Sequence, residues 1–286
     1  MMNKIEKYFQ KDGSQWINDA YSKHHTIAHN RFETVSEIVH QLKPDSLLDI
    51  GCGDGRFLES LSWIKNRIGA DYSDSMLTLA ATNPGDIRFE AIDLNSADSM
   101  MKFKELGELD VITMMGVIHY LVSPLECLQG LINCTHNKTT IVISFRNKLY
   151  NTNPKSKYYS SILTKANSER LDGEKTIWRR NGLDSEDLLM ALKGHPQSKE
   201  LIGSIINDGS YEGATDPEWN PESFEYWRQF TPLEAIILLG QAGFRAIRII
   251  PLISSGTTAM KNKEGPNSRN LIGFCTSYVI VAKVMN

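Results

Sequence analysis

Short apolar runs alternate with amphipathic stretches over the first half of the chain. Residues 46–50 form one such run and end abruptly at glycines, which favours a buried strand over a helix. The same pattern predicts further strands at 67–70, 87–92, 111–115 and 140–145, and helices at 57–64, 74–81 and 125–132. Strands that alternate with helices need crossover connections, so we expect a mainly parallel sheet with helices on both faces.

The pattern changes near the end of the chain. A helix is predicted from Thr231-Pro232 to Gly243, followed by strands at 246–253 and 275–284. A polar, glycine-containing loop joins these two strands, and no long helix lies between them. Parallel neighbours need a long crossover, so we expect these two strands to form an antiparallel pair at one edge of the sheet.

The remaining segments divide the chain into parts. Residues 1–44 have helical spacing of apolar positions, and we interpret them as an N-terminal helical lid. Residues 151–230 are polar, with scattered glycines and prolines and several aromatics, which is typical of an inserted, mostly helical substrate or lid subdomain. The cofactor-binding sheet domain is then built from 45–150 and 231–286.

Composition narrows the function classes. The 286 residues include 41% hydrophobic and 23% charged positions, which is normal for a globular protein with a sizeable core. Lysine and arginine number 31 against 34 acidic residues, and this net charge of −3 argues against a nucleic-acid partner. The chain has no apolar run long enough for a membrane span, no secretory signal and no CxxC pair, so we expect no membrane or metal site and a cytoplasmic location.

Residues 47–55, LLDIGCGDG, carry the most specific signal. The glycine spacing is GxGxG, and Arg56 stands where a dinucleotide fold has its third glycine. Asp49 and Asp54 bring negative charge to this turn, which disfavours a pyrophosphate and favours a cation such as a sulfonium with an α-amino group. Asp71, 20 residues after Gly51, ends the next strand, where a carboxylate can accept hydrogen bonds from ribose hydroxyls. The alternative for these residues is a plain glycine turn with strand-end caps.

Four segments in order resemble the motifs of class I S-adenosylmethionine-dependent methyltransferases: LLDIGCGDG, IGADYSDSML, FEAIDLN and LDVITMMGVIHYL. The resemblance covers roughly residues 30–150 and 231–286, and GQAGF at 240–244 is similar to the small-molecule enzymes related to ubiquinone-biosynthesis O-methyltransferases. It implies a Rossmann-like, seven-stranded sheet with an antiparallel edge hairpin. It also implies S-adenosylmethionine as cofactor and S-adenosylhomocysteine as product.

The resemblance further implies a set of cofactor contacts. The first motif and the start of the fourth would face the methionyl part of the cofactor, Asp71 would hold the ribose, and the second and third motifs would supply the adenine contacts. An N-terminal aromatic and an arginine would close over the cofactor. The residues implied are Tyr21, Arg31, Asp49, Gly51, Cys52, Gly53, Asp71, Tyr72, Met76, Asp93, Leu94, Met115 and Gly116.

The acceptor side has fewer signals. His119 follows the fourth strand, where parallel sheets bind their ligands, and its near-neutral pKa suits a general base. A histidine there can also cap a helix or pack against the sheet. Pairs of tryptophan and arginine in the insert suit an aromatic or anionic substrate, although the same tryptophans can form the core of the insert. The substrate candidates are Tyr120, Trp178, Arg179, Trp227 and Arg228.

These features predict a methyltransferase that acts on a small molecule, with a hydroxyl oxygen as the favoured acceptor. N-methylation of a small amine is the nearest alternative, since an uncharged amine needs no base. A protein or RNA acceptor and a cofactor-binding module without transfer activity are further alternatives. His25 and His29 lie four residues apart on a predicted helix, but no carboxylate–histidine cluster accompanies them as in a metal site. No exposed apolar seam in the sequence indicates an oligomeric state.

Overall fold

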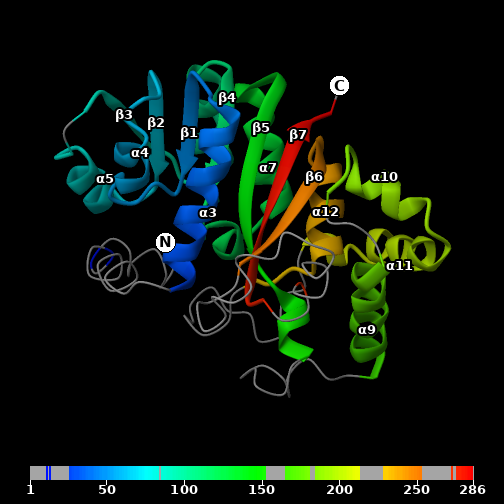
Figure 1. Ribbon diagram of the computed structural model, residues 1–286. Coiled ribbons are helices and arrows are strands. Elements are labelled where there is room, and N and C mark those ends of the chain that lie inside the picture. Colours follow the sequence, from blue (N-terminus) through cyan, green and yellow to red (C-terminus); the bar gives the residue numbers. More distant parts are fainter. Residues whose placement is uncertain are drawn as a thin grey trace.

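The computed structural model describes residues 11, 13, 26–83, 85–152, 165–180, 184–212, 228–252, 272 and 275–285 (Figure 1). Its centre is a seven-stranded sheet with the order β3-β2-β1-β4-β5-β7-β6. The strands are β1 (Ser46–Ile50), β2 (Asn66–Asp71), β3 (Ile87–Ala91), β4 (Leu109–Met114), β5 (Thr135–Arg146), β6 (Phe244–Leu252) and β7 (Ser277–Val284). The first five are parallel, whereas β7 lies antiparallel between β5 and β6. The predicted Rossmann-like sheet and its antiparallel edge pair are therefore confirmed.

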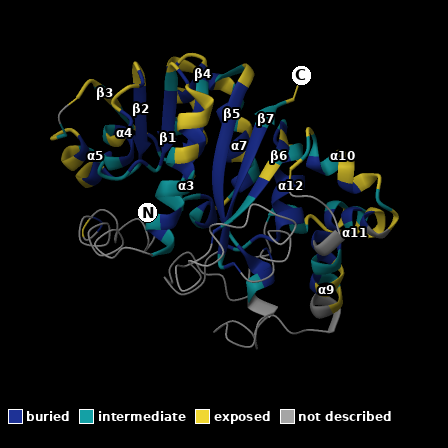
Figure 2. Cartoon of the chain, in the orientation of Figure 1, coloured by how far each residue is buried: buried dark blue, intermediate teal, exposed yellow. Residues whose placement is uncertain are grey.

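Helices cover both faces of this sheet. They are α3 (Ile27–Leu42), α4 (Arg56–Ser60), α5 (Asp74–Ala80), α6 (Ala97–Met100), α7 (Pro124–Leu131) and α12 (Pro232–Gln241), with short 3-10 turns η1 (Met101–Glu105), η2 (Ile118–Tyr120), η3 (Ile132–Cys134), η4 (Lys148–Thr152) and η5 (Ser210–Glu212). On one face, Val35 and Val39 of α3 pack with Leu47, Val111 and Val142 of the strands. On the other face α7 and α12 bury the larger apolar cluster. The strands β1, β2, β4 and β7 are almost entirely buried, whereas the edge strands β3 and β6 are partly exposed (Figure 2).

Local sequence signals set most helix ends. Ser73 caps α5, since its hydroxyl accepts a hydrogen bond from the Met76 N–H at 3.3 Å. Thr231 and Glu234 form a reciprocal capping box at the start of α12. The helix predicted at 57–64 is wrong in extent, because α4 ends at Ser60 and two tight turns follow. Leu61 and Ile64 are both buried in these turns. Residues three apart also share a face of a helix, so the apolar spacing did not distinguish the turns from a longer helix.

The described part of the insert is helical, as predicted, and comprises α9 (Lys165–Arg180), α10 (Leu188–Lys193) and α11 (Pro196–Asn207). Its apolar side chains, among them Trp178 and Ile205, belong to the same hydrophobic core as α12 and the sheet. The carboxylate of Glu174 accepts hydrogen bonds from the Trp178 indole at 2.8 Å and from the Leu233 N–H at 2.9 Å. These helices are therefore anchored to α12 by buried polar bonds as well as by apolar contact.

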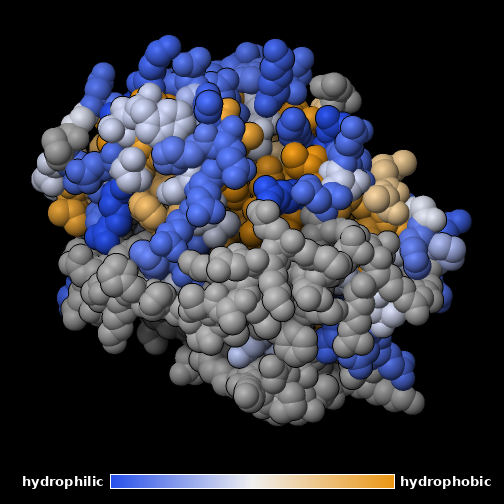
Figure 3. All heavy atoms as spheres, in the orientation of Figure 1, coloured by the Kyte–Doolittle hydropathy of each residue, from blue (hydrophilic) through white to orange (hydrophobic). Residues whose placement is uncertain are grey.

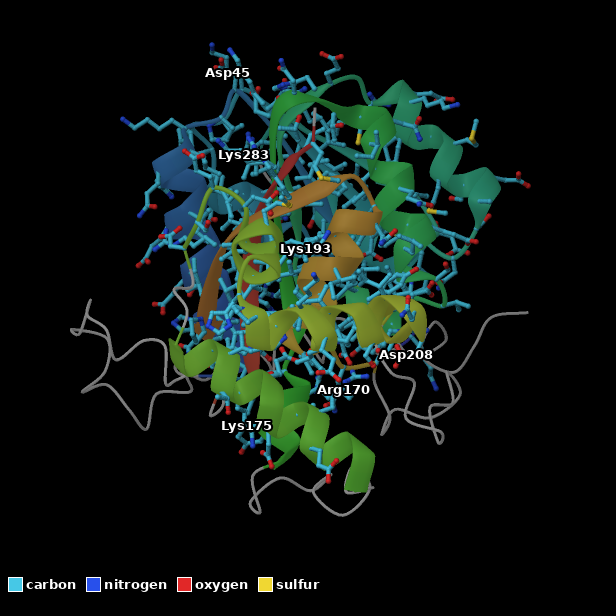
Figure 4. All side chains as sticks on the ribbon, turned by 90° about the vertical axis from the view of Figure 1, so that its right-hand side faces the viewer. Asp45, Arg170, Lys175, Lys193, Asp208 and Lys283 are labelled. Carbon is cyan, nitrogen blue, oxygen red and sulfur yellow. The ribbon has the colours of Figure 1, made fainter. Side chains whose placement is uncertain are left out.

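A second carboxylate strengthens this anchorage. Glu234 is fully buried and pairs with Lys148 at 3.1 Å and with Arg170 of α9. Figure 4 shows Arg170 and Asp208 directed toward one another from α9 and the end of α11, where their charged groups are 3.8 Å apart. The surface is hydrophilic along the upper edge of the view in Figure 3, and apolar atoms reach the surface nearer its middle. Within the described residues, no helix has the length and apolar character of a membrane span.

Candidate functional site

The carboxyl ends of β1, β2, β4 and β5 meet at the same edge of the sheet, and α3 begins at this edge (Figure 1). The turn after β1 places Gly51, Gly53 and Gly55 at positive φ, at 69°, 56° and 76°. A Cβ on Gly51 would lie only 2.2 Å from the Cγ2 atom of Val117, which follows β4. The turn therefore needs glycine for its backbone conformation and for its close approach to the neighbouring loop.

Asp71, at the end of β2, ties this turn in place. Its Oδ2 atom accepts a hydrogen bond from the Gly53 N–H at 2.9 Å, and its Oδ1 atom accepts one from the Ser73 N–H at 3.0 Å. Burial raises the pKa of the carboxyl, and these backbone hydrogen bonds lower it. The Tyr72 backbone also bonds this carboxyl. A carboxylate has about four lone-pair sites, so it can accept a further bond, for example from a hydroxyl.

Asp49, on β1, is the second buried carboxylate of the site. The Thr113 hydroxyl donates to its Oδ1 atom at 2.7 Å, from the position directly opposite on β4. Burial raises its pKa to about 7, the bond from Thr113 opposes this rise, and the charge of Asp71 adds to it. Asp54, expected to add negative charge to the turn, is instead paired with Arg56 at 2.6 Å. The negative charge that a cationic ligand can meet therefore belongs to Asp49 and Asp71.

The residues implied for adenine lie along the adjoining ends of β2 and β3. The Ile92 N–H donates to the Asp71 carbonyl at 2.9 Å, which holds the chain after β3 beside the end of β2. Asp93 follows, half-exposed, with its Oδ1 atom accepting from the Asn95 N–H at 2.9 Å. The other adenine candidates flank this edge, half-buried or buried: Tyr72, Met76 and Leu94.

Arg31 of α3 lies over the turn after β4. A Cβ on Gly116 would come within 2.8 Å of the Arg31 Nη1 atom, so the guanidinium rests directly against this glycine. The Nε atom of Arg31 is buried and has no hydrogen-bond partner in the described part of the chain. A half-buried guanidinium whose buried Nε lacks an acceptor favours an anionic ligand, and the carboxylate of a methionyl group fits this requirement.

His119 lies in η2, just beyond this glycine turn. Its side chain is buried against the Tyr120 ring, with 4.2 Å between the ring centres. Burial, and then the positive charges of Arg146 and Arg31, hold the pKa of His119 well below its usual range. Its carbonyl oxygen accepts the Arg228 N–H at 3.2 Å. The imidazole is therefore neutral at physiological pH, the protonation state that a general base requires.

Two of the substrate candidates are buried in the protein. Trp178 is fully buried, and Arg228 is buried with its guanidinium donating to the carbonyl oxygens of Val122 at 3.0 Å and Glu212 at 2.5 Å. The burial of Trp178 favours the alternative in which the tryptophans form a core, and the guanidinium of Arg228 is bonded within the protein. His29 lies 3.2 Å from Glu33. The following candidates lie outside the described residues or side chains: Tyr21, His25, Arg179 and Trp227.

The sequence pattern did not identify three polar residues near the site. Thr113 and Ser144 are buried on β4 and β5, and Arg146 ends β5. The usable signal was the polar pair Ser144 and Arg146, two residues apart on an otherwise apolar strand, which places both side chains on one face. Their proximity to Gly116 depends on the pairing of β4 with β5, which the sequence pattern did not specify.

Residues 27–184, more than half of the chain, match a family described as "Methyltransferase domain". The chain belongs to this family. No curated protein matches it in a sequence comparison. The predicted resemblance to the class I S-adenosylmethionine-dependent methyltransferases is thereby confirmed at the level of family and fold.

Solved structures share the whole architecture at low sequence identity. A S-adenosylmethionine-dependent methyltransferase from Clostridium acetobutylicum is 12% identical, with 96% of this chain and 99% of that chain covered and a TM-score of 0.53. Magnesium protoporphyrin IX methyltransferase from Synechocystis, with bound SAH, is 13% identical, with 99% and 98% covered and a TM-score of 0.53. The 1,6-didemethyltoxoflavin-N1-methyltransferase of Burkholderia thailandensis is 13% identical, with 98% and 85% covered and a TM-score of 0.51. These likenesses establish the methyltransferase fold.

Asp49→Asn is expected to raise the free energy of unfolding above pH 7 and to weaken cofactor binding. The folded-state pKa of Asp49, about 7, lies above the unfolded value of about 3.9, so the wild-type protein loses stability as the pH rises between these values. Asparagine carries no proton to lose, and the gain reaches up to about 4 kcal/mol. Thermal melts of both proteins at pH 5 and pH 8 would measure it.

Asp110→Asn is the matched control, with the opposite sign. Burial raises the pKa of Asp110, but the hydrogen bonds from Ser46, His136 and Asp45 together outweigh it and lower the pKa overall. Its carboxylate therefore stabilises the fold at pH 8, and Asp110→Asn is expected to lower the melting temperature there. Equal changes in melting temperature at pH 8 in Asp49→Asn and Asp110→Asn would contradict the assignment of a raised pKa to Asp49.

Proposed function

We propose that the protein transfers a methyl group from S-adenosylmethionine to a hydroxyl oxygen of a small molecule. The observation that carries this proposal is the placement of His119, a buried and neutral imidazole three residues from Gly116. A hydroxyl acceptor must lose its proton during transfer, whereas an uncharged amine can react without a base. The histidine thus favours oxygen over nitrogen, and N-methylation remains the alternative.

The residues of the site fit the cofactor from end to end. Asp71 offers an acceptor oxygen for the ribose, and Asp49 offers negative charge beside the glycine turn for the cationic part. Arg31 presents its guanidinium, whose buried Nε has no partner among the described residues, for the methionyl carboxylate. Tyr72, Met76, Asp93 and Leu94 supply the apolar and polar surface for adenine.

Besides binding the cofactor, the protein must position the methyl acceptor and accept its proton. When bound, the cofactor supplies a methyl group on a sulfonium, which is already an activated leaving group. The chain holds the acceptor near the turn after β4, and burial around His119 excludes water. His119 takes the hydroxyl proton on a ring nitrogen, and the Tyr120 ring packed against it limits the orientations of the imidazole.

The test is incubation with methyl-labelled cofactor and a pool of small-molecule hydroxyl and amine compounds, with mass spectrometry of products that gain one methyl. Oxygen-methylated products are expected, and His119→Gln should lower turnover about 10²-fold or more with cofactor affinity unchanged. His136→Gln is the control, because His136 is bonded to Asp110 at the opposite edge of the sheet. N-methylated products alone, or full turnover by His119→Gln, would contradict the choice of oxygen. A protein that binds cofactor but forms no methylated product would instead be a binding module.

A further inference from the structure

The end of β5 carries a positive charge on the face covered by α3. Val142, on this face, packs with Val35 and Val39 of α3 in one apolar cluster. Side chains two apart on a strand share a face, so Ser144 and Arg146 lie on the α3 side as well. Arg146 is the last residue of the strand and is half-buried, and its charge acts on His119 in the turn after β4.

A second arginine approaches the same place from α3. Arg31 precedes Val35 by one helical turn and therefore lies on the same face of the helix. Its guanidinium rests on Gly116, and the Gly116 N–H donates to the Ser144 hydroxyl at 2.9 Å. Arg31 therefore contacts Gly116 directly, and Arg146 lies two residues beyond the serine that bonds this glycine.

The electrostatics agree with this geometry. Both guanidinium groups lie near enough to His119 to disfavour its protonated form. The buried carboxylates Asp49 and Asp71 belong to β1 and β2, on the other side of the glycine turn. The site is therefore polarised, with negative charge at the ends of β1 and β2 and positive charge at the ends of β4 and β5.

The cofactor carries a single carboxylate, which the proposed function assigns to Arg31. We propose that Arg146 binds an acidic group of the methyl acceptor, so that the acceptor is a small carboxylate or phosphate that also bears the hydroxyl. This inference rests on the proposed function and names the substrate class of the same site. Arg146 is then a specificity-determining residue that orients the acceptor hydroxyl toward His119.

Binding of such an anion has a second consequence. A negative charge beside Arg146 offsets the effect of this arginine on His119, and the pKa of His119 rises toward the value that suits a base at neutral pH. An acidic acceptor would thereby improve the base that deprotonates it, whereas a neutral analogue of the same shape would not.

The experiment uses the full chain loaded with S-adenosylhomocysteine, whose carboxylate engages Arg31. Benzoate, phenyl phosphate and neutral benzamide are titrated by calorimetry or by NMR. Benzoate or phenyl phosphate should bind saturably and at least 10-fold more tightly than benzamide, and the stronger of the two identifies the acidic group. Arg146→Gln should weaken this anion at least 10-fold.

Two further variants separate the possible failures. Arg88→Gln, which removes an exposed arginine paired with Glu90 on β3, should bind the anion like the wild type. Arg31→Gln should weaken S-adenosylhomocysteine and leave the preference for the anion over benzamide intact. The inference would be overturned if the wild type bound the anion no more tightly than benzamide, or if Arg146→Gln kept the preference for the anion. Cofactor binding would still support the proposed function in either case. Failure to bind the cofactor would count against the proposed function. In that case, anion titrations of the unloaded chain would still test whether Arg146 binds the anion.

Discussion

Asp71→Ala is expected to weaken cofactor binding at least about 100-fold, the largest effect of any single side chain in the site. The carboxylate accepts hydrogen bonds from the N–H groups of Gly53 and Ser73, at 2.9 and 3.0 Å, and so holds the glycine turn against the end of β2. It is also the group proposed to bind the ribose. Hydrogen bonds to a charged group contribute about 1.5–3 kcal/mol each, and 100-fold corresponds to about 2.7 kcal/mol.

Calorimetric titration with S-adenosylhomocysteine measures this loss. Asp71→Asn keeps one carbonyl oxygen but turns an amide N–H₂ toward backbone donors, so an intermediate affinity is expected. Asp74→Ala is the control, since Asp74 is exposed in the first turn of α5 and near in sequence. Circular dichroism establishes that each variant is folded. An unchanged dissociation constant in Asp71→Ala would show that this carboxylate does not bind the cofactor.

Gly51→Ala is expected to lower the free energy of unfolding by about 2–4 kcal/mol. Alanine at a φ of 69° is strained, and its Cβ would lie 2.2 Å from the Val117 Cγ2 atom, far inside van der Waals contact. The chain must move one of the two loops that form the site. Chemical denaturation measures the stability, and cofactor affinity should fall in the same variant because the turn is displaced.

Two variants divide this effect into its causes. Gly107 also has a positive φ, 76°, but nothing lies within 4 Å of a Cβ built there, so Gly107→Ala isolates the backbone strain, about 1 kcal/mol. Val117→Ala removes the Cγ2 atom, and the double variant Gly51→Ala/Val117→Ala should therefore be less unstable than the two single effects added together. A Gly51→Ala variant no less stable than Gly107→Ala would contradict the close approach of the two loops.

Local patterns were sufficient for most of the architecture. The strands of the sheet were predicted because a short apolar run ended by glycine, proline or a polar residue is a signal contained in a few neighbouring residues. The extent of α4 was predicted wrongly for the same reason. Leu61 and Ile64 continue the apolar spacing of a helix and are both buried, but the backbone after Ser60 forms two tight turns instead.

The tryptophans and arginines of the insert illustrate a different difficulty. Trp178 and Arg228 were candidates for substrate contact because a flat apolar ring beside a guanidinium suits an aromatic or anionic ligand. In the structure Trp178 donates to Glu174 inside the core, and Arg228 donates to carbonyl oxygens of Val122 and Glu212. The type of a residue determines which groups its side chain can bind. The packing of α9 and α12 determines which of those groups lies within hydrogen-bond distance.

The sequence by itself determined the family, the sheet and the four motifs, because the glycine turn and the strand-end carboxylates are encoded within short segments. Only the tertiary structure brought Arg31, His119 and Arg146 together, from a helix, a turn and a strand end far apart in the chain. Their meeting depends on the pairing of β4 with β5 and on the docking of α3 across them. The charge at the acceptor side of the site follows from those long-range contacts, since no local periodicity encodes which strands become neighbours.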